Sequence, residues 1–164
     1  MANLISDEVL DSACEEVGNY SDDQARLEME RLSKAQPALL AYVMASTEDL
    51  EPEAQEVAIY MFVVIHKAFE KQFGASLQVA DINSVEQISD ANDQAILELF
   101  ADDERIPEAA AAYVQKQPVL FNYVAECFTE PEEGESELSE DDQGALSVVM
   151  KTVIDVLDSS VRDQ

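Results

Sequence analysis

Residues 52–74 read PEAQEVAIYMFVVIHKAFEKQFG, and this stretch decides the fold class. Its middle, VAIYMFVVI at 57–65, is apolar on every side of a helix, which is typical of a helix buried at the centre of a domain. The β-branched residues would also suit a strand, but the length of the stretch and Gly74 just past its end favour a helix. We therefore expect a buried helix from Pro52 to Phe73. Its apolar run is far shorter than the roughly 20 residues that a membrane-spanning helix needs.

Helical periodicity extends from this stretch towards the N-terminus. Apolar residues between Ile5 and Val17 fall on one stripe, with Ser6 as a cap and Gly18 as a terminator. The sequence SDDQ at 21–24 is a capping box, and it predicts a second helix to about Lys34. A third helix is expected to begin at Pro37, because proline suits the first helical position.

The C-terminal half shows the same periodicity after a linker at about 75–82. A second capping box is expected at Ser84–Gln87, and helices are expected over about 91–101, from Pro107 and from Pro118. The last helix is expected from about Ser139 to Ser160. Its core face is predicted to consist of Leu146, Val149, Met150, Val153, Ile154 and Leu157.

A short phrase occurs twice, as QPALLAYV at 36–43 and as QPVLFNYV at 117–124. Its surroundings match weakly as well. Ile5-Ser6-Asp7 resembles Ile88-Ser89-Asp90, and EPEAQEVAIYMFVV at 51–64 aligns with SEDDQGALSVVMKT at 139–152. These matches predict an internal duplication. The matched segments after the repeated phrase are separated by more residues than the phrases themselves, and an acidic insertion at about 131–137 would account for this difference.

The duplication predicts a single all-α domain over residues 1–164, with similar halves at about 5–74 and about 84–160. Together the halves would contribute about eight helices to a helical bundle or to a short solenoid-like array. Each half alone is small for an independent hydrophobic core, so we expect the two halves to share one core.

The repeated phrase has a structural and a functional interpretation. Pro37 and Pro118 are expected to start helices at equivalent corners of the two halves. Tyr42 and Tyr123 would then place their rings in the core and their hydroxyls at its edge. We favour this structural interpretation over the alternative, in which the two tyrosines form a paired recognition surface.

The charge of the chain is strongly one-sided, with 36 acidic and nine basic residues and a net charge of −27. Such a field repels nucleic acid and anionic membranes and attracts basic partners. A salty habitat would explain the same charge without a specific partner. Residues 130–142 are the most acidic stretch, and their candidate interaction residues are Glu132, Glu133, Glu135, Glu137, Glu140, Asp141 and Asp142.

The residue types that carry chemistry are scarce. His66 is the single histidine, and Val63 stands where a di-iron ExxH pattern would require a glutamate. We therefore favour a helix-face histidine bonded to a carbonyl or carboxylate over a metal ligand or catalyst. Cys14 and Cys127 lie in apolar helical patterns outside any CxxC motif, which is typical of reduced, buried thiols. No phosphate-binding glycine loop or EF-hand order occurs, so no cofactor or metal is expected.

Three classes of function are compatible with these observations. The favoured one is a non-enzymatic interaction or regulatory protein that binds the basic surface of another protein. The alternatives are a nucleic-acid-mimicking inhibitor of a DNA- or RNA-binding protein, and a carboxylate- or metal-dependent enzyme. We expect no direct nucleic-acid or membrane partner. The acidic start MANLISDEVLD does not resemble a signal peptide, so a cytoplasmic location is expected. A homodimer is compatible with a duplicated helical domain, whereas the net charge favours a monomer.

Overall fold

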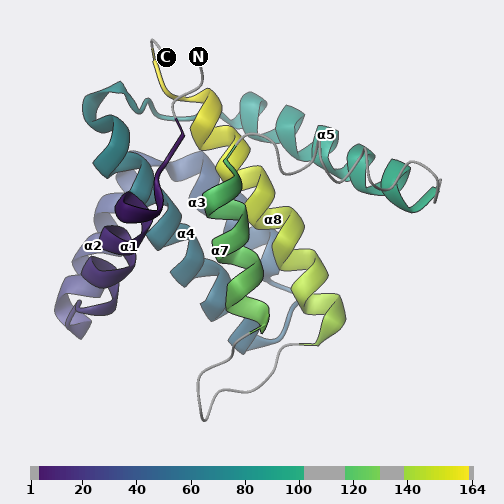
Figure 1. Cartoon of the computed structure of the whole chain (residues 1–164). Helices are drawn as coiled ribbons and strands as arrows, with labels where there is room; N and C mark the ends of the chain where they lie inside the picture. The colour runs from purple at the N-terminus through teal and green to yellow at the C-terminus, as the bar shows by residue number, and fades with distance from the viewer. Residues whose placement is uncertain (1–3, 102–116, 130–138, 163–164) are drawn as a thin grey trace.

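The computed structural model describes residues 4–101, 117–129 and 139–162. These ranges form seven α-helices and one 3₁₀ turn and contain no strand, as Figure 1 shows. The helices are α1 (Asp7–Gly18), α2 (Asp22–Ala35), α3 (Pro37–Thr47), α4 (Pro52–Phe73), α5 (Ile82–Ala101), α7 (Pro118–Thr129) and α8 (Glu140–Ser159). The all-α prediction is confirmed. The helix expected from Pro107 lies outside the described residues.

The predicted start signals of the N-terminal helices are confirmed. The Ser6 hydroxyl caps α1. At the start of α2, the Ser21 N–H donates to Gln24 Oε1 over 2.8 Å and the Gln24 N–H donates to Ser21 Oγ over 3.2 Å, which completes the capping box. Helices α3, α4 and α7 each begin at a proline. Gly74 ends α4 with a φ of 54°, a conformation that glycine adopts without strain.

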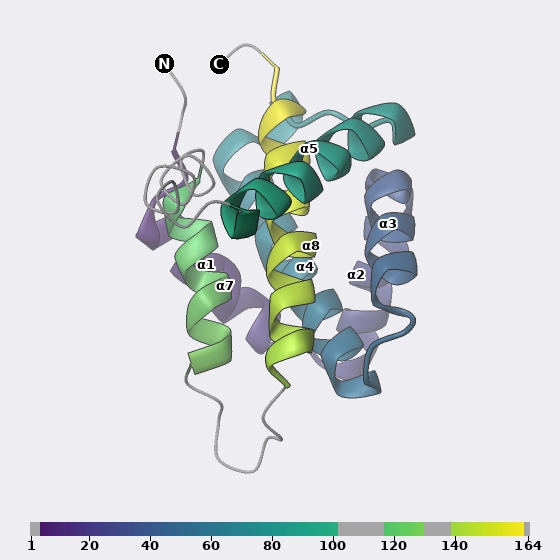
Figure 2. The same ribbon diagram turned by 90° about the vertical axis from the view of Figure 1, so that its right-hand side faces the viewer.

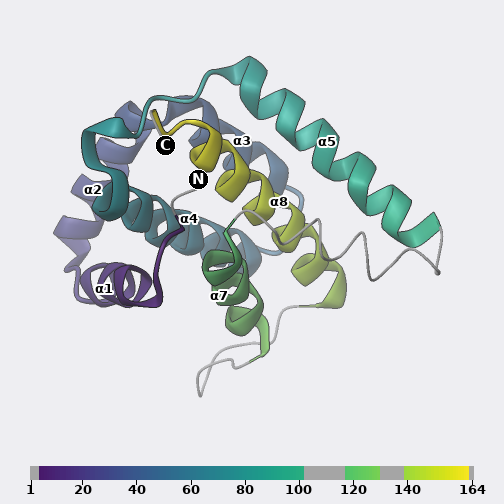
Figure 3. The same cartoon turned by 45° about the horizontal axis from the view of Figure 1, so that its top comes forward.

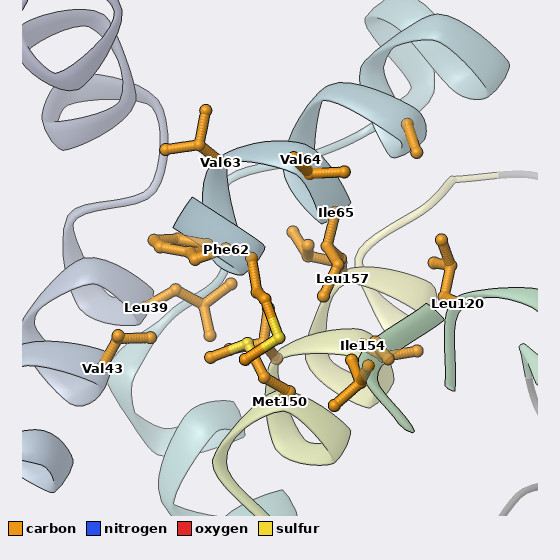
Figure 4. Packing of buried hydrophobic residues seen from close by; sticks show 14 of the residues in the cluster. Leu39, Val43, Phe62, Val63, Val64, Ile65, Leu120, Met150, Ile154 and Leu157 are labelled. Carbon is orange, nitrogen blue, oxygen red and sulfur yellow. The ribbon is translucent and has the colours of Figure 1, made fainter. Parts of the chain in front are cut away.

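Helices α4 and α8 pack against each other through the middle of the molecule (Figures 1 and 2). Figure 4 shows Phe62 and Ile65 of α4 among Met150, Ile154 and Leu157 of α8, and all five are buried. Burying each large apolar side chain contributes about 1.5–3 kcal/mol. The whole predicted core face of the last helix is buried, so that prediction is confirmed.

Helix α5 differs from the prediction. It begins at Ile82, and the Asp81 carboxylate rather than Ser84 caps it, because Asp81 Oδ1 accepts the Ser84 N–H over 2.8 Å. A helix that begins at Ile82 turns three residues at helical spacing towards the rest of the protein: Val85, Ile88 and Asn92. A helix that began near residue 91 would leave Val85 and Ile88 outside this apolar face. The predicted second capping box and the start near residue 91 are therefore wrong. Ser89 also lies inside α5, so it does not correspond to the cap residue Ser6.

The linker between α4 and α5 contains a 3₁₀ turn (Gly74–Ser76) followed by irregular chain, as the sequence predicted. Leu77 forms one isolated antiparallel bridge with Val161. The Gln78 N–H donates to the Ser160 carbonyl and the Arg162 N–H donates to the Ser76 carbonyl, both over 2.8 Å. These bonds hold the chain after α8 against the linker.

The helices contact one another in a reciprocal pattern. Helix α1 packs on α4 and α7, and α5 packs on α8 and α3. Helix α3 packs on α4, and α7 packs on α8. Figure 2 shows α3 and α7 on opposite sides of the central α4–α8 pair.

The two glutamines of the repeated phrase make matching contacts. Gln36 Oε1 accepts the Ala80 N–H and Gln36 Nε2 donates to the Gln78 carbonyl, both over 3.0 Å. Gln117 Oε1 accepts the Ile5 N–H over 3.0 Å, and Gln117 Nε2 donates to Asp158 Oδ1 over 2.9 Å.

Each of these glutamines is 2% exposed and precedes a proline-initiated helix. Ile5 and Ala80, whose N–H groups they bind, each lie two residues before a helix, α1 and α5 respectively. Each glutamine therefore holds the backbone just before a helix that is distant in sequence.

Replacing either glutamine with alanine leaves a buried backbone N–H without its acceptor. We expect Gln36→Ala and Gln117→Ala each to lower the free energy of unfolding by about 1–3 kcal/mol in urea titrations. The matched control is Gln72→Ala, because Gln72 is exposed on α4 and should change stability by less than about 0.5 kcal/mol. Equal effects of all three substitutions would contradict the role assigned to Gln36 and Gln117.

Candidate functional site

Helices α4 and α8 begin and α7 ends at the same end of the molecule (Figures 1 and 2). The segments at this end carry several exposed acidic residues. They are contributed by the turn between α3 and α4 and by the first turns of α4 and α8. We call the following residues the acidic end: Glu48, Asp49, Glu51, Glu53 and Asp141. Acids in a first helical turn are also favourable to the helix dipole, so this arrangement stabilises both helix starts.

The sequence supplies no basic residue to the segments that form this end. No lysine or arginine occurs between Lys34 and Lys67, or between Lys116 and Lys151. These two gaps contain the α3–α4 turn, the C-terminal turn of α7 and the N-terminal turn of α8. The absence of lysine and arginine from these two stretches is a sequence signal for an acidic surface. The local density of acids indicates only residues 130–142.

Three basic side chains of α2 and α4, those of Arg31, Lys67 and Lys71, are instead used between helices. Both terminal nitrogens of Arg31 donate to the Glu70 carboxylate, over 2.7 and 2.6 Å, and Arg31 also binds Glu28. Lys67 Nζ lies 3.0 Å from Glu28 Oε1 and 3.3 Å from Glu16 Oε2. We call Glu16, Glu28, Arg31, Lys67 and Glu70 the ionic cluster. It connects α1, α2 and α4.

The ionic cluster shifts the pKa of its members. Burial alone would raise the pKa of the Glu70 carboxyl, but hydrogen bonds from His66 and Arg31 outweigh burial and hold the pKa well below its ordinary value. Burial likewise opposes a hydrogen bond from Arg31 at Glu28, and the net effect is again a lowered pKa. Both carboxylates therefore stay ionised in the folded protein at pH values where they would be protonated in the unfolded chain.

His66 is placed as the sequence predicted, on α4 and bonded to a carboxylate. It is 2% exposed, its Nδ1 lies 3.3 Å from Glu70 Oε1, and its ring meets Phe62 edge to face. Arg31 and Lys67 share the same glutamate. His66 is thus part of the packing that supports the ionic cluster.

The structure does not bring Tyr42 and Tyr123 together. Tyr42 lies on α3 and Tyr123 on α7, and these helices flank the α4–α8 pair on opposite sides (Figure 2). Both side chains are half-buried against the core. Burial and the neighbouring Cys127 and Cys14 thiols raise the pKa of the Tyr123 hydroxyl. Cys14 and Cys127 form no disulfide in the described residues, as the sequence predicted, but both are half-buried rather than buried.

The candidate acids of residues 130–142 fall into two groups. Glu132, Glu133, Glu135 and Glu137 lie outside the described residues. Glu140 begins α8, Asp141 is exposed, and Asp142 is buried with its N–H bonded to the Ser139 hydroxyl. Of the seven, the structure thus assigns an exposed side chain to Asp141, whereas Asp142 belongs to the cap of α8.

A second polar cluster, which the sequence analysis missed, lies between α5 and α8. Lys151 Nζ donates to Asp155 Oδ2 over 2.5 Å, and Asn92 Nδ2 donates to Asp155 Oδ2 and to the Thr152 hydroxyl. All four side chains are buried, and Asp155 Oδ1 has no hydrogen-bond partner among the described residues. Lys151 and Asp155 are four residues apart on a helix, and this spacing of opposite charges predicts an ion pair.

The described residues also contain a depression of about 310 Å³ between the α4–α5 linker and the end of α8. Asp81 is the one carboxylate among its lining residues, and His66 does not line it. Within the described ranges, no group of three or more histidine, cysteine or acidic side chains is arranged to hold a metal ion. None of the helices in these ranges has the length and hydropathy to cross a membrane.

Comparisons with known proteins found no relationship. No protein-family model matches the chain, and no similar curated protein or solved structure was found.

The lowered pKa of Glu70 predicts a pH-dependent contribution to stability. A carboxyl whose pKa is lower in the folded state stabilises the protein above its unfolded pKa, near 4.5, and this contribution is lost as the pH falls. Glu70→Gln should therefore lower the free energy of unfolding by about 1–2 kcal/mol at pH 7, and the deficit should shrink below about pH 4.5.

Urea titrations across this pH range measure the effect. The control is Glu30→Gln, which removes an exposed carboxylate of α2 and should leave the pH dependence unchanged. A constant deficit at every pH would argue against an ionic role for Glu70.

Proposed function

We propose that this chain is a non-enzymatic interaction protein whose acidic end binds a lysine- or arginine-rich surface of another protein. The observation that supports the proposal is the separation of charge within the fold. Arg31 of α2 and Lys67 of α4 are held in contacts between helices, whereas the segments that carry the acidic end contain no lysine or arginine. Basic and acidic side chains are therefore concentrated on different segments of the chain.

Such a surface acts mainly on the rate at which a partner associates. Carboxylates on one face attract a cationic partner over distances near the Debye length, about 8–10 Å at physiological salt, and they orient it during encounter. Glu48, Asp49 and Glu51 lie in one turn between two packed helices. The scaffold that carries them is fixed before binding, which lowers the ordering cost of association.

The proposal includes an internal duplication, in which α1, α3 and α4 correspond to α5, α7 and α8. Two observations support it. The helix contacts are exchanged between the halves, since α1 packs on α4 and α7 whereas α5 packs on α8 and α3. The glutamines before α3 and α7 each bind the backbone just before the first helix of the other half. On this correspondence the second half begins near Ala80.

A basic peptide tests the binding proposal directly. The probe is a fluorescent oligolysine of about ten residues, titrated at low ionic strength by anisotropy. The test variant carries E48Q, D49N, E51Q and D141N, and the matched control carries D11N, E15Q, E86Q and D90N, which are equally many exposed acids on α1 and α5. We expect the test variant to bind about tenfold more weakly than the control, because four exposed charge contacts together contribute on the order of 1.4 kcal/mol.

Two results would overturn this proposal. Equal weakening by both variants would mean that the peptide responds to net charge alone. Unchanged binding by the test variant would mean that the peptide binds elsewhere.

Superposition of the two halves in a crystal structure tests the duplication. We expect α1, α3 and α4 to superpose together on α5, α7 and α8 after one rotation close to a twofold. If the helices superpose only singly, with a different rotation for each, the halves are unrelated.

A further inference from the structure

Cys14 and Cys127 lie on two helices that pack against each other, α1 and α7. Both side chains are half-buried and border the same hydrophobic core. Gln117 also binds the backbone of Ile5, which connects the start of α7 to the residues just before α1. The helices that carry the two thiols are therefore joined at their starts as well as along their sides.

The thiols belong to one group of side chains. Tyr123 lies one turn before Cys127 on α7 and is hydrogen-bonded to its thiol, and the Cys14 thiol is near enough to influence the same hydroxyl. Tyr60 of α4, which also influences Tyr123, is 46% exposed. Its hydroxyl lies 4.0 Å from the position that a Cβ of Gly18 would occupy at the end of α1. Solvent thus reaches the edge of a group formed by α1, α4 and α7.

We infer that Cys14 and Cys127 form a modification site, in which a low-molecular-weight disulfide oxidises them to an intramolecular disulfide between α1 and α7. In the first step one protein thiolate attacks a sulfur of glutathione disulfide, the glutathione S–S bond breaks, and one glutathione leaves as a thiolate. In the second step the other protein thiolate attacks the protein sulfur of the mixed disulfide and releases the second glutathione. The protein loses two electrons and two protons, and glutathione disulfide becomes two molecules of glutathione.

The environment of Cys14 sets the rate of this exchange. Burial and the adjacent Cys127 thiol raise the pKa of the Cys14 thiol, with a smaller contribution from Asp11. Little thiolate is therefore present at neutral pH, and exchange is slow. The site should respond to sustained oxidising conditions and remain reduced during brief exposure.

The disulfide should change stability in a measurable way. It would close a long loop between α1 and α7, which restricts the unfolded chain strongly. We expect the oxidised protein to unfold at a Tm higher by roughly 10 °C, and a reductant to reverse the change.

The test incubates the folded full-length protein with glutathione disulfide and analyses it by intact mass, by non-reducing peptide mapping and by thermal unfolding. We expect a loss of two hydrogen atoms and a cross-linked peptide pair containing Cys14 and Cys127. The variants Cys14→Ser and Cys127→Ser, checked for helical content by circular dichroism, should form only the mixed disulfide with glutathione. They should show no rise in Tm.

Three outcomes would overturn the inference. The first is a wild-type protein that stays reduced. The second is accumulation of mixed disulfides or of disulfide-linked dimers in place of the intramolecular bond. The third is an intramolecular disulfide that forms only after urea has unfolded the protein, since this would show that the native packing keeps the thiols apart.

Discussion

Helices α4 and α8 pack against each other and form the centre of the hydrophobic core. These long helices supply most of the large buried side chains, and α1, α3, α5 and α7 each pack on one or both of them. Because residues 61–66 of α4 are all buried, neighbouring helices must enclose this stretch from several sides. The surrounding helices satisfy this requirement from both flanks of the pair (Figure 3).

The large negative charge opposes this compact arrangement, since carboxylates on a folded surface repel one another. The ionic cluster offsets part of the repulsion at the junction of α1, α2 and α4. A consequence is that Arg31 and Lys67 neutralise acids within that cluster. These two cations lie away from the acidic end, whose own segments contain no lysine or arginine.

Local signals in the sequence were sufficient for most of the fold. Ser21 and Gln24 predicted a capping box, prolines predicted the starts of α3, α4 and α7, and apolar spacing predicted the buried face of α8. The start of α5 was missed because Asp81 and Ser84 both suit a cap, and the choice depends on Val85 finding a buried position. That position is set by tertiary packing, which a local pattern does not contain.

The candidate sites were less predictable for the same reason. The partners of Gln36 before α5 depend on how distant segments meet, and the repeated phrase alone does not identify them. The hydrogen bond between Arg31 and Glu70 joins residues that are far apart in sequence, and the periodicity of a single helix does not predict it. The thiols, by contrast, were visible as residue types, and only the packing of α1 on α7 makes them a pair.

On the proposed function, the acidic end rather than the net charge as a whole recognises a basic partner. Backbone amide chemical shifts, recorded by NMR during titration with an oligolysine peptide, distinguish these two possibilities. We expect saturable shift changes confined to residues 48–53 and 139–142, with small changes on the exposed acids of α1 and α5. Shift changes spread evenly over all exposed acidic residues would contradict it.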